Sequence, residues 1–134
     1  MKPILVVEDD TRLRISYERV LLRMGYKVLL AEDGEQALSM ILRIPVLMVI
    51  TGIQMPKMDG LALLKEIRHR VGSLPVLVIT EYYSPSMIEL VMKAGATDYK
   101  IKPINLEEFI KTIESIMIRF YYNVEIVTDS QNGL

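Results

Sequence analysis

The sequence predicts an α/β fold in which five parallel strands alternate with five helices, a (βα)5 arrangement. Short apolar runs recur along the chain, and each is followed by a segment whose apolar residues repeat at helical spacing. The run at 47–51 has no alternating polar face, which is typical of a strand covered on both faces. Capping signals precede several of the helical segments.

The first half of the chain supplies two strand–helix units. Residues 4–7 form a β-branched-rich apolar run between Pro3 and Glu8, which predicts the first strand. The following helical pattern ends at Gly25, a residue suited to a helix C-terminal cap. Residues 27–31 predict the second strand, and the capping box at 33–36 opens a helix that runs to about Arg43.

The second half supplies three further units. Strands are predicted at 47–51, 76–80 and 98–101, with a helix at about 61–70 after the first of them. Ser86 begins a capping box for a helix that ends near 94–95. Asn105 begins another, for a last helix that reaches about Phe120.

Right-handed crossovers leave few topologies for such a chain, and a flavodoxin-like, doubly wound parallel sheet with strand order 2-1-3-4-5 is the expected one. Ligands of such sheets bind beyond the carboxyl ends of the strands, near the point where the strand order reverses. Here that point lies between the first and third strands.

Size and composition exclude several classes of protein. The chain has 134 residues, enough for one compact domain, and its formal net charge of -1 gives no basic footprint for nucleic acid. It contains no cysteine, which favours a reducing, cytoplasmic setting. No run of 18 apolar residues predicts a membrane span, and the start has no secretory pattern.

Polar residues follow the predicted strands at the ligand edge. Glu8, Asp9 and Asp10 end the first strand, Thr80 ends the fourth, and Lys102 follows the fifth. Carboxylates gathered in this way favour a hard cation such as Mg²⁺, and the lysine and hydroxyl suit an anionic group. The alternative is a solvated ion-pair cluster that binds no ligand.

These residues belong to a set of motifs that resembles the receiver domain of bacterial response regulators, which accept a phosphoryl group from histidine kinases in two-component signal transduction. The resemblance covers about residues 2–120 and leaves 121–134 as a C-terminal tail or linker. The motifs are ILVVEDD (4–10), AEDGEQAL (31–38), MPKMDG (55–60), PVLVIT (75–80), AGATDY (94–99) and KP (102–103).

The resemblance implies roles for individual residues. Glu8, Asp9 and the backbone carbonyl of Gln54 would hold Mg²⁺. Thr80 would contact the phosphoryl group, and Lys102 would respond to it. It further implies that Tyr99 is the switch residue that turns inward on activation and that the Lys102–Pro103 peptide is cis.

One residue departs from the family pattern. The pattern places the phosphoryl-accepting aspartate three residues before the Met-Pro pair, where this chain has Gly52. Thr51 is one residue out of register, so its side chain is expected on the opposite face of the strand. The expected protein is therefore a pseudo-receiver, not an enzyme, with Mg²⁺ held weakly or not at all. Gly52 is either a natural loss or an introduced substitution.

A second departure follows the fourth strand, where the family usually has a small residue and this chain has Glu81. One hypothesis is that the Glu81 carboxylate folds toward Lys102 and Thr80 and replaces the missing negative charge. The other is that it points into solvent.

The sequence is also compatible with other functions. A phosphorylation-competent receiver would use another acidic residue, Asp10 or Asp59. The chain would otherwise be a fragment of a longer transcriptional regulator in a phosphorelay. A flavin-binding protein is disfavoured, because no glycine- and hydroxyl-rich phosphate loop follows the first strand.

The expected partners are a sensor histidine kinase or another signalling protein, with no direct nucleic-acid or membrane contact. The resemblance implies a surface for homodimers on the fourth helix, fifth strand and fifth helix, to which apolar residues of the fourth helix could contribute: Met87, Ile88, Val91 and Met92. Alternating residues at 124–128 could add a strand or belong to a linker.

Overall fold

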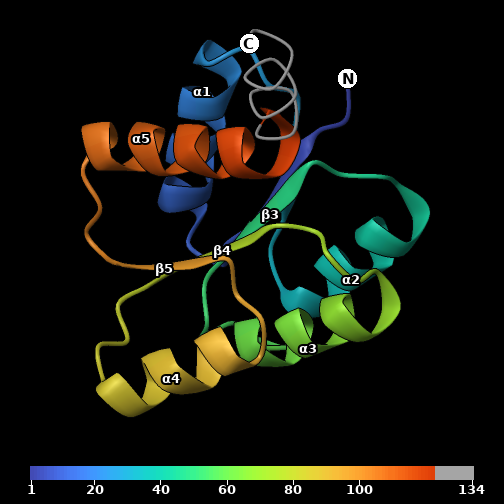
Figure 1. Ribbon diagram of the computed structural model, residues 1–134, viewed down its shortest axis with the longest axis vertical. Coiled ribbons are helices and arrows are strands. Elements are labelled where there is room, and N and C mark those ends of the chain that lie inside the picture. The colour runs from blue at the N-terminus through green and yellow to red at the C-terminus, as the bar shows by residue number, and fades with distance from the viewer. Residues whose placement is uncertain (123–134) are drawn as a thin grey trace, which may run out of the picture. The chain divides into compact units, whose positions relative to one another are not determined.

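The computed structural model describes residues 1–122 and confirms the alternation of strands and helices (Figure 1). The chain divides into two compact units, residues 1–103 and a second that begins at Ile104. The first unit contains β1 (Ile4–Val7), α1 (Thr11–Arg23), β2 (Val28–Ala31), α2 (Gly34–Arg43), β3 (Met48–Thr51), α3 (Gly60–Arg70), β4 (Val76–Thr80), α4 (Pro85–Lys93) and β5 (Asp98–Ile101).

The sheet has the predicted parallel order, β2-β1-β3-β4-β5. Val7 pairs with Ala31 on one side and with Thr51 on the other, and Thr80 pairs with Ile101. This register places the carboxyl ends of the strands along one edge of the sheet. The residues that follow those ends are therefore neighbours in space, although they are far apart in sequence.

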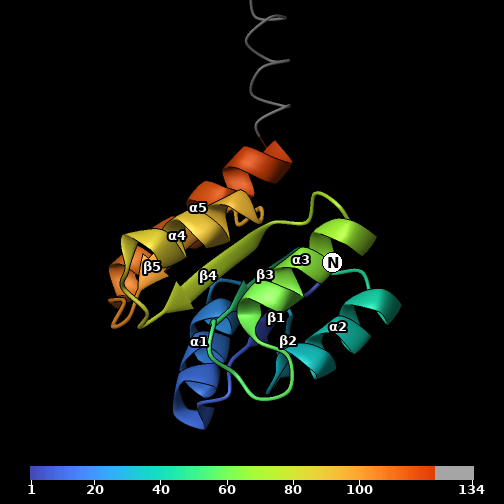
Figure 2. The ribbon, with the colours of Figure 1, turned by 90° about the horizontal axis from the view of Figure 1, so that it is seen from below.

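The first unit has its helices on both faces of the sheet. Figure 1 shows α1 on one side of the sheet and α2, α3 and α4 on the other, and Figure 2 shows α3 between α2 and α4. Alternate strand residues such as Leu5, Val49 and Val78 are fully buried together with Leu63 and Ile67 of α3. Helices on both faces explain why β1 to β4 lack a polar face, whereas β5 has Asp98 and Lys100, both half-buried.

The second unit begins with α5 (Leu106–Met117) and continues into a short, wider π-helical turn, η1 (Ile118–Tyr122). Asn105 caps α5 as predicted, because its side-chain oxygen accepts a hydrogen bond from the Glu108 amide at 2.8 Å. The α-helix ends at Met117, three residues before the predicted end. The possible strand or linker at 124–128 lies outside the described residues.

One predicted cap is wrong. The residue that caps the start of α4 is Ser84 and not Ser86, because the Ser84 hydroxyl accepts a hydrogen bond from the Met87 amide at 3.0 Å. Pro85 explains the difference: it occupies the first turn, where its missing N–H costs nothing and its fixed φ suits a helix. The cap predicted at Asp33 is confirmed, because its carboxylate accepts a hydrogen bond from the Gln36 amide at 2.7 Å.

Lys57, in the turn before α3, adopts a φ of 68°, a left-handed conformation that is unfavourable for residues with a Cβ. Its side chain is exposed and only 4.0 Å from the Asp33 carboxylate, a distance at which a surface ion pair contributes little. Replacing Lys57 by glycine should therefore raise the free energy of unfolding by up to about 1 kcal/mol. Urea titration would measure this gain, with Lys57→Ala as the control, which removes the ion pair but keeps the Cβ. Equal stability of both variants would contradict the assignment of the strain to φ.

Candidate functional site

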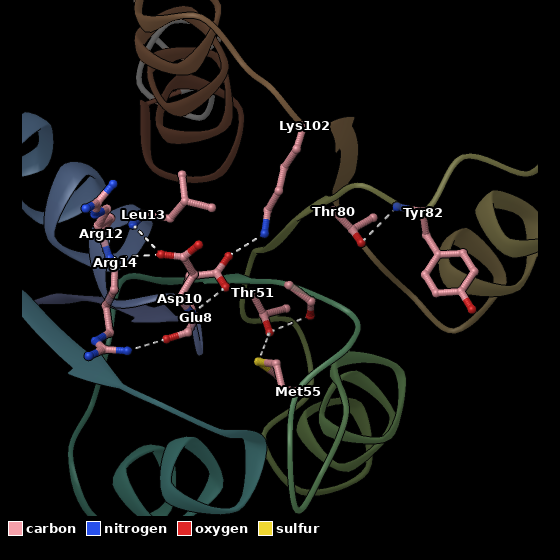
Figure 3. Close-up of polar contacts among 11 residues, drawn as sticks. Glu8, Asp10, Arg12, Leu13, Arg14, Thr51, Met55, Thr80, Tyr82 and Lys102 are labelled. Carbon is pink, nitrogen blue, oxygen red and sulfur yellow. Dashed lines mark hydrogen bonds and ion pairs between the residues drawn. The ribbon is translucent and has the colours of Figure 1, made fainter.

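The polar residues predicted at the carboxyl ends of the strands do converge. Glu8 follows β1, Thr80 ends β4 and Lys102 follows β5, and Figure 3 shows these side chains at one edge of the sheet. Gly52 follows β3, directly between the ends of β1 and β4 in the sheet order. The cis Lys102–Pro103 peptide that the family resemblance implied is present.

Glu8 and Lys102 form the central contact of the site. The Lys102 ammonium lies 2.6 Å from Glu8 Oε1, and both side chains are largely withdrawn from solvent, with 3% of Glu8 and 17% of Lys102 exposed. The second carboxylate oxygen of Glu8 accepts a hydrogen bond from the Asp10 amide at 3.1 Å. Both oxygens of Glu8 are therefore engaged inside the protein.

Burial raises the pKa of the Glu8 carboxyl above its usual value of 4.5, because desolvation outweighs the favourable contacts with Lys102 and the Asp10 amide. The neighbouring Asp9 side chain adds a smaller raising effect. Since the folded state then binds the Glu8 proton more tightly than the unfolded state does, the contribution of Glu8 to stability is lost as pH rises above 4.5 through the folded-state pKa. The ion pair is thus a costly arrangement that depends on Lys102.

Gly52 lies beside this pair without a side chain. Its amide donates to the Val7 carbonyl at 3.2 Å, which continues the β1–β3 ladder. A Cβ placed at Gly52 would lie 3.7 Å from Glu8 Oε1 and 3.8 Å from the Ile79 carbonyl oxygen, ordinary contact distances, and its φ is not left-handed. Neither space nor backbone conformation therefore requires a glycine here. A side chain at this position would begin next to the carboxylate of Glu8.

Thr51 does not substitute for the missing side chain. Its hydroxyl donates to the Gly52 carbonyl at 2.9 Å and lies 3.9 Å from the Met55 sulfur. Figure 3 shows the Thr51 side chain with its contacts to the β3–α3 segment.

Thr80 and Tyr99 both engage the backbone of Tyr82, which follows β4. The buried Thr80 hydroxyl accepts a hydrogen bond from the Tyr82 amide at 3.2 Å, and the Tyr99 hydroxyl donates to the Tyr82 carbonyl. Partial burial raises the pKa of the Tyr99 phenol. The hydroxyl predicted to contact a phosphoryl group and the predicted switch residue are therefore connected through one residue of the β4–α4 segment.

The hypothesis that Glu81 replaces the missing charge is wrong in this structure. Glu81 is exposed, and Lys102 pairs with Glu8 while Thr80 binds the Tyr82 amide. Turning toward solvent spares the Glu81 carboxylate the cost of burial beside Glu8, which is already a buried negative charge.

The predicted Mg²⁺ ligands divide into two groups. Asp9 and Gln54 line the same open hollow of about 530 Å³, whereas Glu8 is paired with Lys102. Within residues 1–122, no group of three or more carboxylate or histidine side chains could hold a metal ion. Asp9 and Gln54 supply oxygen donors of the kind that Mg²⁺ prefers, with water needed at the remaining positions. The residues fit a weak site.

The two acids considered as alternative phosphoryl acceptors both cap helices. Asp10 Oδ1 accepts from the Arg12 and Leu13 amides at the start of α1, and Asp59 Oδ1 accepts from the Ala62 amide at the start of α3. A phosphoryl group on either carboxylate would compete with these hydrogen bonds.

Arg14, a buried residue at the same edge, was not among the predicted site residues. Its Nη1 donates to the Glu8 carbonyl oxygen at 2.7 Å (Figure 3). Arg14 lies three residues before Tyr17 and seven before Leu21, on the buried face of α1. An arginine on the apolar face of a predicted helix was the signal that could have identified it.

The expected apolar surface of α4 requires a correction. Val91 is fully buried and Met87 packs against the core, whereas Leu90 and Met92 are 52% and 41% exposed. Homodimer formation through α4, β5 and α5 stays a prediction.

The family model of the response regulator receiver domain matches residues 4–114. The chain belongs to this family. Among curated relatives, the receiver domain is 39% identical over 116 residues to the response regulator MprA of Mycobacterium leprae, covering 87% of this chain and 51% of MprA. The chain thus spans about half the length of that relative. No helix among the described residues is long and apolar enough to span a membrane.

Solved receiver structures share the fold. A CheY-like receiver domain from Methanospirillum hungatei superposes with a TM-score of 0.85 at 27% identity, covering 89% of this chain and 95% of that one. The response regulator TrrA of Thermotoga maritima, solved in complex with Mg²⁺–BeF, has a TM-score of 0.77 at 32% identity, covering 86% and 98% of the two chains.

Proposed function

We propose that this receiver domain acts in two-component signalling through protein–protein contacts and accepts no phosphoryl group as it stands. The observation that carries the proposal is Gly52, which lies beside the Glu8–Lys102 pair and has no carboxylate. An acyl phosphate forms only when a carboxylate oxygen attacks phosphorus. The site retains the surrounding acid, hydroxyl and lysine but lacks the attacking group.

The Glu8–Lys102 contact supports this proposal. With no acceptor carboxylate at residue 52, Lys102 has Glu8 as its buried anionic partner at 2.6 Å. A new anion at the site would have to compete with Glu8 for this lysine. The receiver is therefore expected to keep one arrangement of the pocket whether or not a phosphoryl donor is present.

Mg²⁺ is a weak ligand in this proposal. Asp9 and the Gln54 carbonyl would hold it, and the third protein ligand would be absent with Gly52 in place. When bound, the cation would reduce the negative charge of an incoming phosphoryl donor. Glu8 would have to leave Lys102 to contribute a second carboxylate.

The partners and setting follow from the family. A sensor histidine kinase or another cytoplasmic signalling protein would contact the domain directly. The longer relatives include ZraR of Escherichia coli, named a transcriptional regulatory protein, of which this chain covers 30% at 35% identity. By analogy, the domain would control an output module within a longer regulator or a separate protein.

Restoring the acceptor tests the proposal. The Gly52→Asp variant should take up one phosphoryl group from acetyl phosphate in the presence of Mg²⁺, because its Cβ fits at ordinary contact distances and its side chain would begin beside Glu8, the partner of Lys102. The bound cation should also raise the melting temperature of this variant more than that of the parent. Intact-protein mass spectrometry and thermal melts give the two readings.

Gly52→Asn is the matched control, because it has nearly the same size but offers no carboxylate oxygen. It should remain unmodified. A Gly52→Asp protein that folds and binds Mg²⁺ but takes up no phosphate would mean that the pocket has lost more than its acceptor.

A further inference from the structure

We infer that Arg14 is a positioning residue for the acidic turn of Glu8, Asp9 and Asp10, and that it holds Asp9 in place for a divalent cation. The inference rests on the proposed function in one respect, the assignment of Asp9 as a metal ligand. The buried Arg14 guanidinium contacts the backbone of this turn.

Arg14 is 8% exposed, although it is a charged residue on a helix that also faces solvent. Its Nη1 donates to the Glu8 carbonyl oxygen at 2.7 Å, a hydrogen bond strengthened by the positive charge of the donor. This carbonyl belongs to Glu8, the first residue after β1, and its direction sets where Asp9 begins.

The remaining partners of Arg14 are weaker. Nη2 lies 3.4 Å from the Thr11 hydroxyl and 3.6 Å from the Glu32 carboxylate, whose side chain is 70% exposed. An ion pair with so exposed a partner contributes little to stability. The backbone of Glu8 is therefore the contact that justifies burying this side chain.

The acidic turn is fixed at two further points. Glu8 Oε2 accepts from the Asp10 amide, and Asp10 Oδ1 accepts from the Arg12 amide at 2.9 Å. These contacts fix Glu8 and Asp10 on either side of Asp9, and both Asp9 and Asp10 are exposed. Arg14 completes the set by fixing the peptide that connects Glu8 to Asp9.

Two effects of Arg14 on a cation at Asp9 have opposite signs. As a nearby positive charge, Arg14 repels the cation, so its removal should strengthen binding. As a positioning residue, it orients the ligand, and loss of such an outer contact typically weakens metal binding about 10- to 100-fold. The direction of the change in affinity therefore distinguishes the two.

The experiment measures Mg²⁺ affinity in the Gly52→Asp background, where a third ligand is present. Arg14→Met, which keeps the apolar stem, should weaken Mg²⁺ binding about tenfold. Arg14→Lys, which keeps a charged donor, should recover part of the loss. Arg19→Met is the control, since Arg19 lies exposed on the same helix and should leave the affinity unchanged. Unchanged or tighter binding in folded Arg14→Met would overturn the inference.

A second measurement uses the chain with Gly52 and no metal. Hydrogen exchange of the Asp10 amide, which donates to Glu8, reports the geometry of the turn directly. Arg14→Met should speed the exchange of the Asp10 amide at least several-fold, while the amides of β1 stay protected. Equal protection of the Asp10 amide in Arg14→Met and in Arg19→Met would also overturn the inference. If the Asp10 amide exchanges faster in Arg14→Met but Gly52→Asp takes up no phosphate, the proposed function fails and the role of Arg14 in the turn stands.

Discussion

Replacing Lys102 by methionine should lower the free energy of unfolding by about 3–5 kcal/mol near pH 7, because it leaves the Glu8 carboxylate buried without its cation. Only 3% of the Glu8 side chain is exposed, so water cannot take over the role of the ammonium. Urea titration of the variant and the parent measures the loss.

The loss should shrink as the pH falls. Burial already raises the pKa of Glu8, and Lys102 is the largest influence that lowers it, so removing Lys102 raises this pKa further. Below the folded-state pKa, Glu8 in the variant is protonated and needs no cation. The stability of Lys102→Met should therefore fall more steeply than that of the parent as pH rises above 4.5.

The double variant Glu8→Gln with Lys102→Met is the control. It removes both charges and keeps an oxygen that can accept from the Asp10 amide, so it should recover most of the lost stability at pH 7. Two results would show that the packing of Lys102, and not its charge, is responsible. One is a loss of stability in Lys102→Met that does not depend on pH, and the other is a double variant that is as unstable as the single one.

Gly60→Ala should be strongly destabilising, by about 3 kcal/mol or more. A Cβ at Gly60 would lie 1.9 Å from the Gly52 carbonyl oxygen and 2.9 Å from the Ile53 Cα, both backbone atoms of the segment after β3. The Gly60 amide also donates to the Ile53 carbonyl at 2.7 Å, so the two segments cannot separate without losing that hydrogen bond. Thermal and urea unfolding would measure the effect.

Gly52→Ala is the matched control for Gly60→Ala. No heavy atom of the surroundings lies closer than 3.7 Å to a Cβ at Gly52, and its φ is not left-handed. Alanine there should leave stability unchanged or raise it by about 0.4–1 kcal/mol through the unfolded state. If both variants unfold equally easily, the close approach of the backbone at Gly60 does not determine the result.

The fold could be predicted from the sequence because its signals are local and agree with one another. The strands and helices could be predicted from apolar runs, helical periodicity and the caps at Asp33 and Asn105. The strand order could be predicted from the handedness of the crossovers. The cap at Ser84 was missed because Ser86 offered a matching pattern two residues later, and the influence of Pro85 was overlooked.

The site was predicted less completely. Glu8 and Lys102 are 94 residues apart in the sequence, yet their meeting follows from the shared edge of a parallel sheet. The contact of Arg14 with a carbonyl and the two hydrogen bonds on Tyr82 were not predicted, because contacts from side chain to backbone across turns carry no periodic signal. The orientation of Glu81 could not be predicted, because only the structure establishes which anion is paired with Lys102.

Whether this receiver accepts a phosphoryl group is decided by the intact mass of the chain with Gly52 after incubation with acetyl phosphate and Mg²⁺. The mass should stay unchanged under conditions that modify Gly52→Asp, because residue 52 offers no carboxylate and Asp10 and Asp59 are engaged as helix caps. A species carrying one phosphoryl group on the unmodified sequence would contradict this prediction, and peptide mapping would then locate the acceptor.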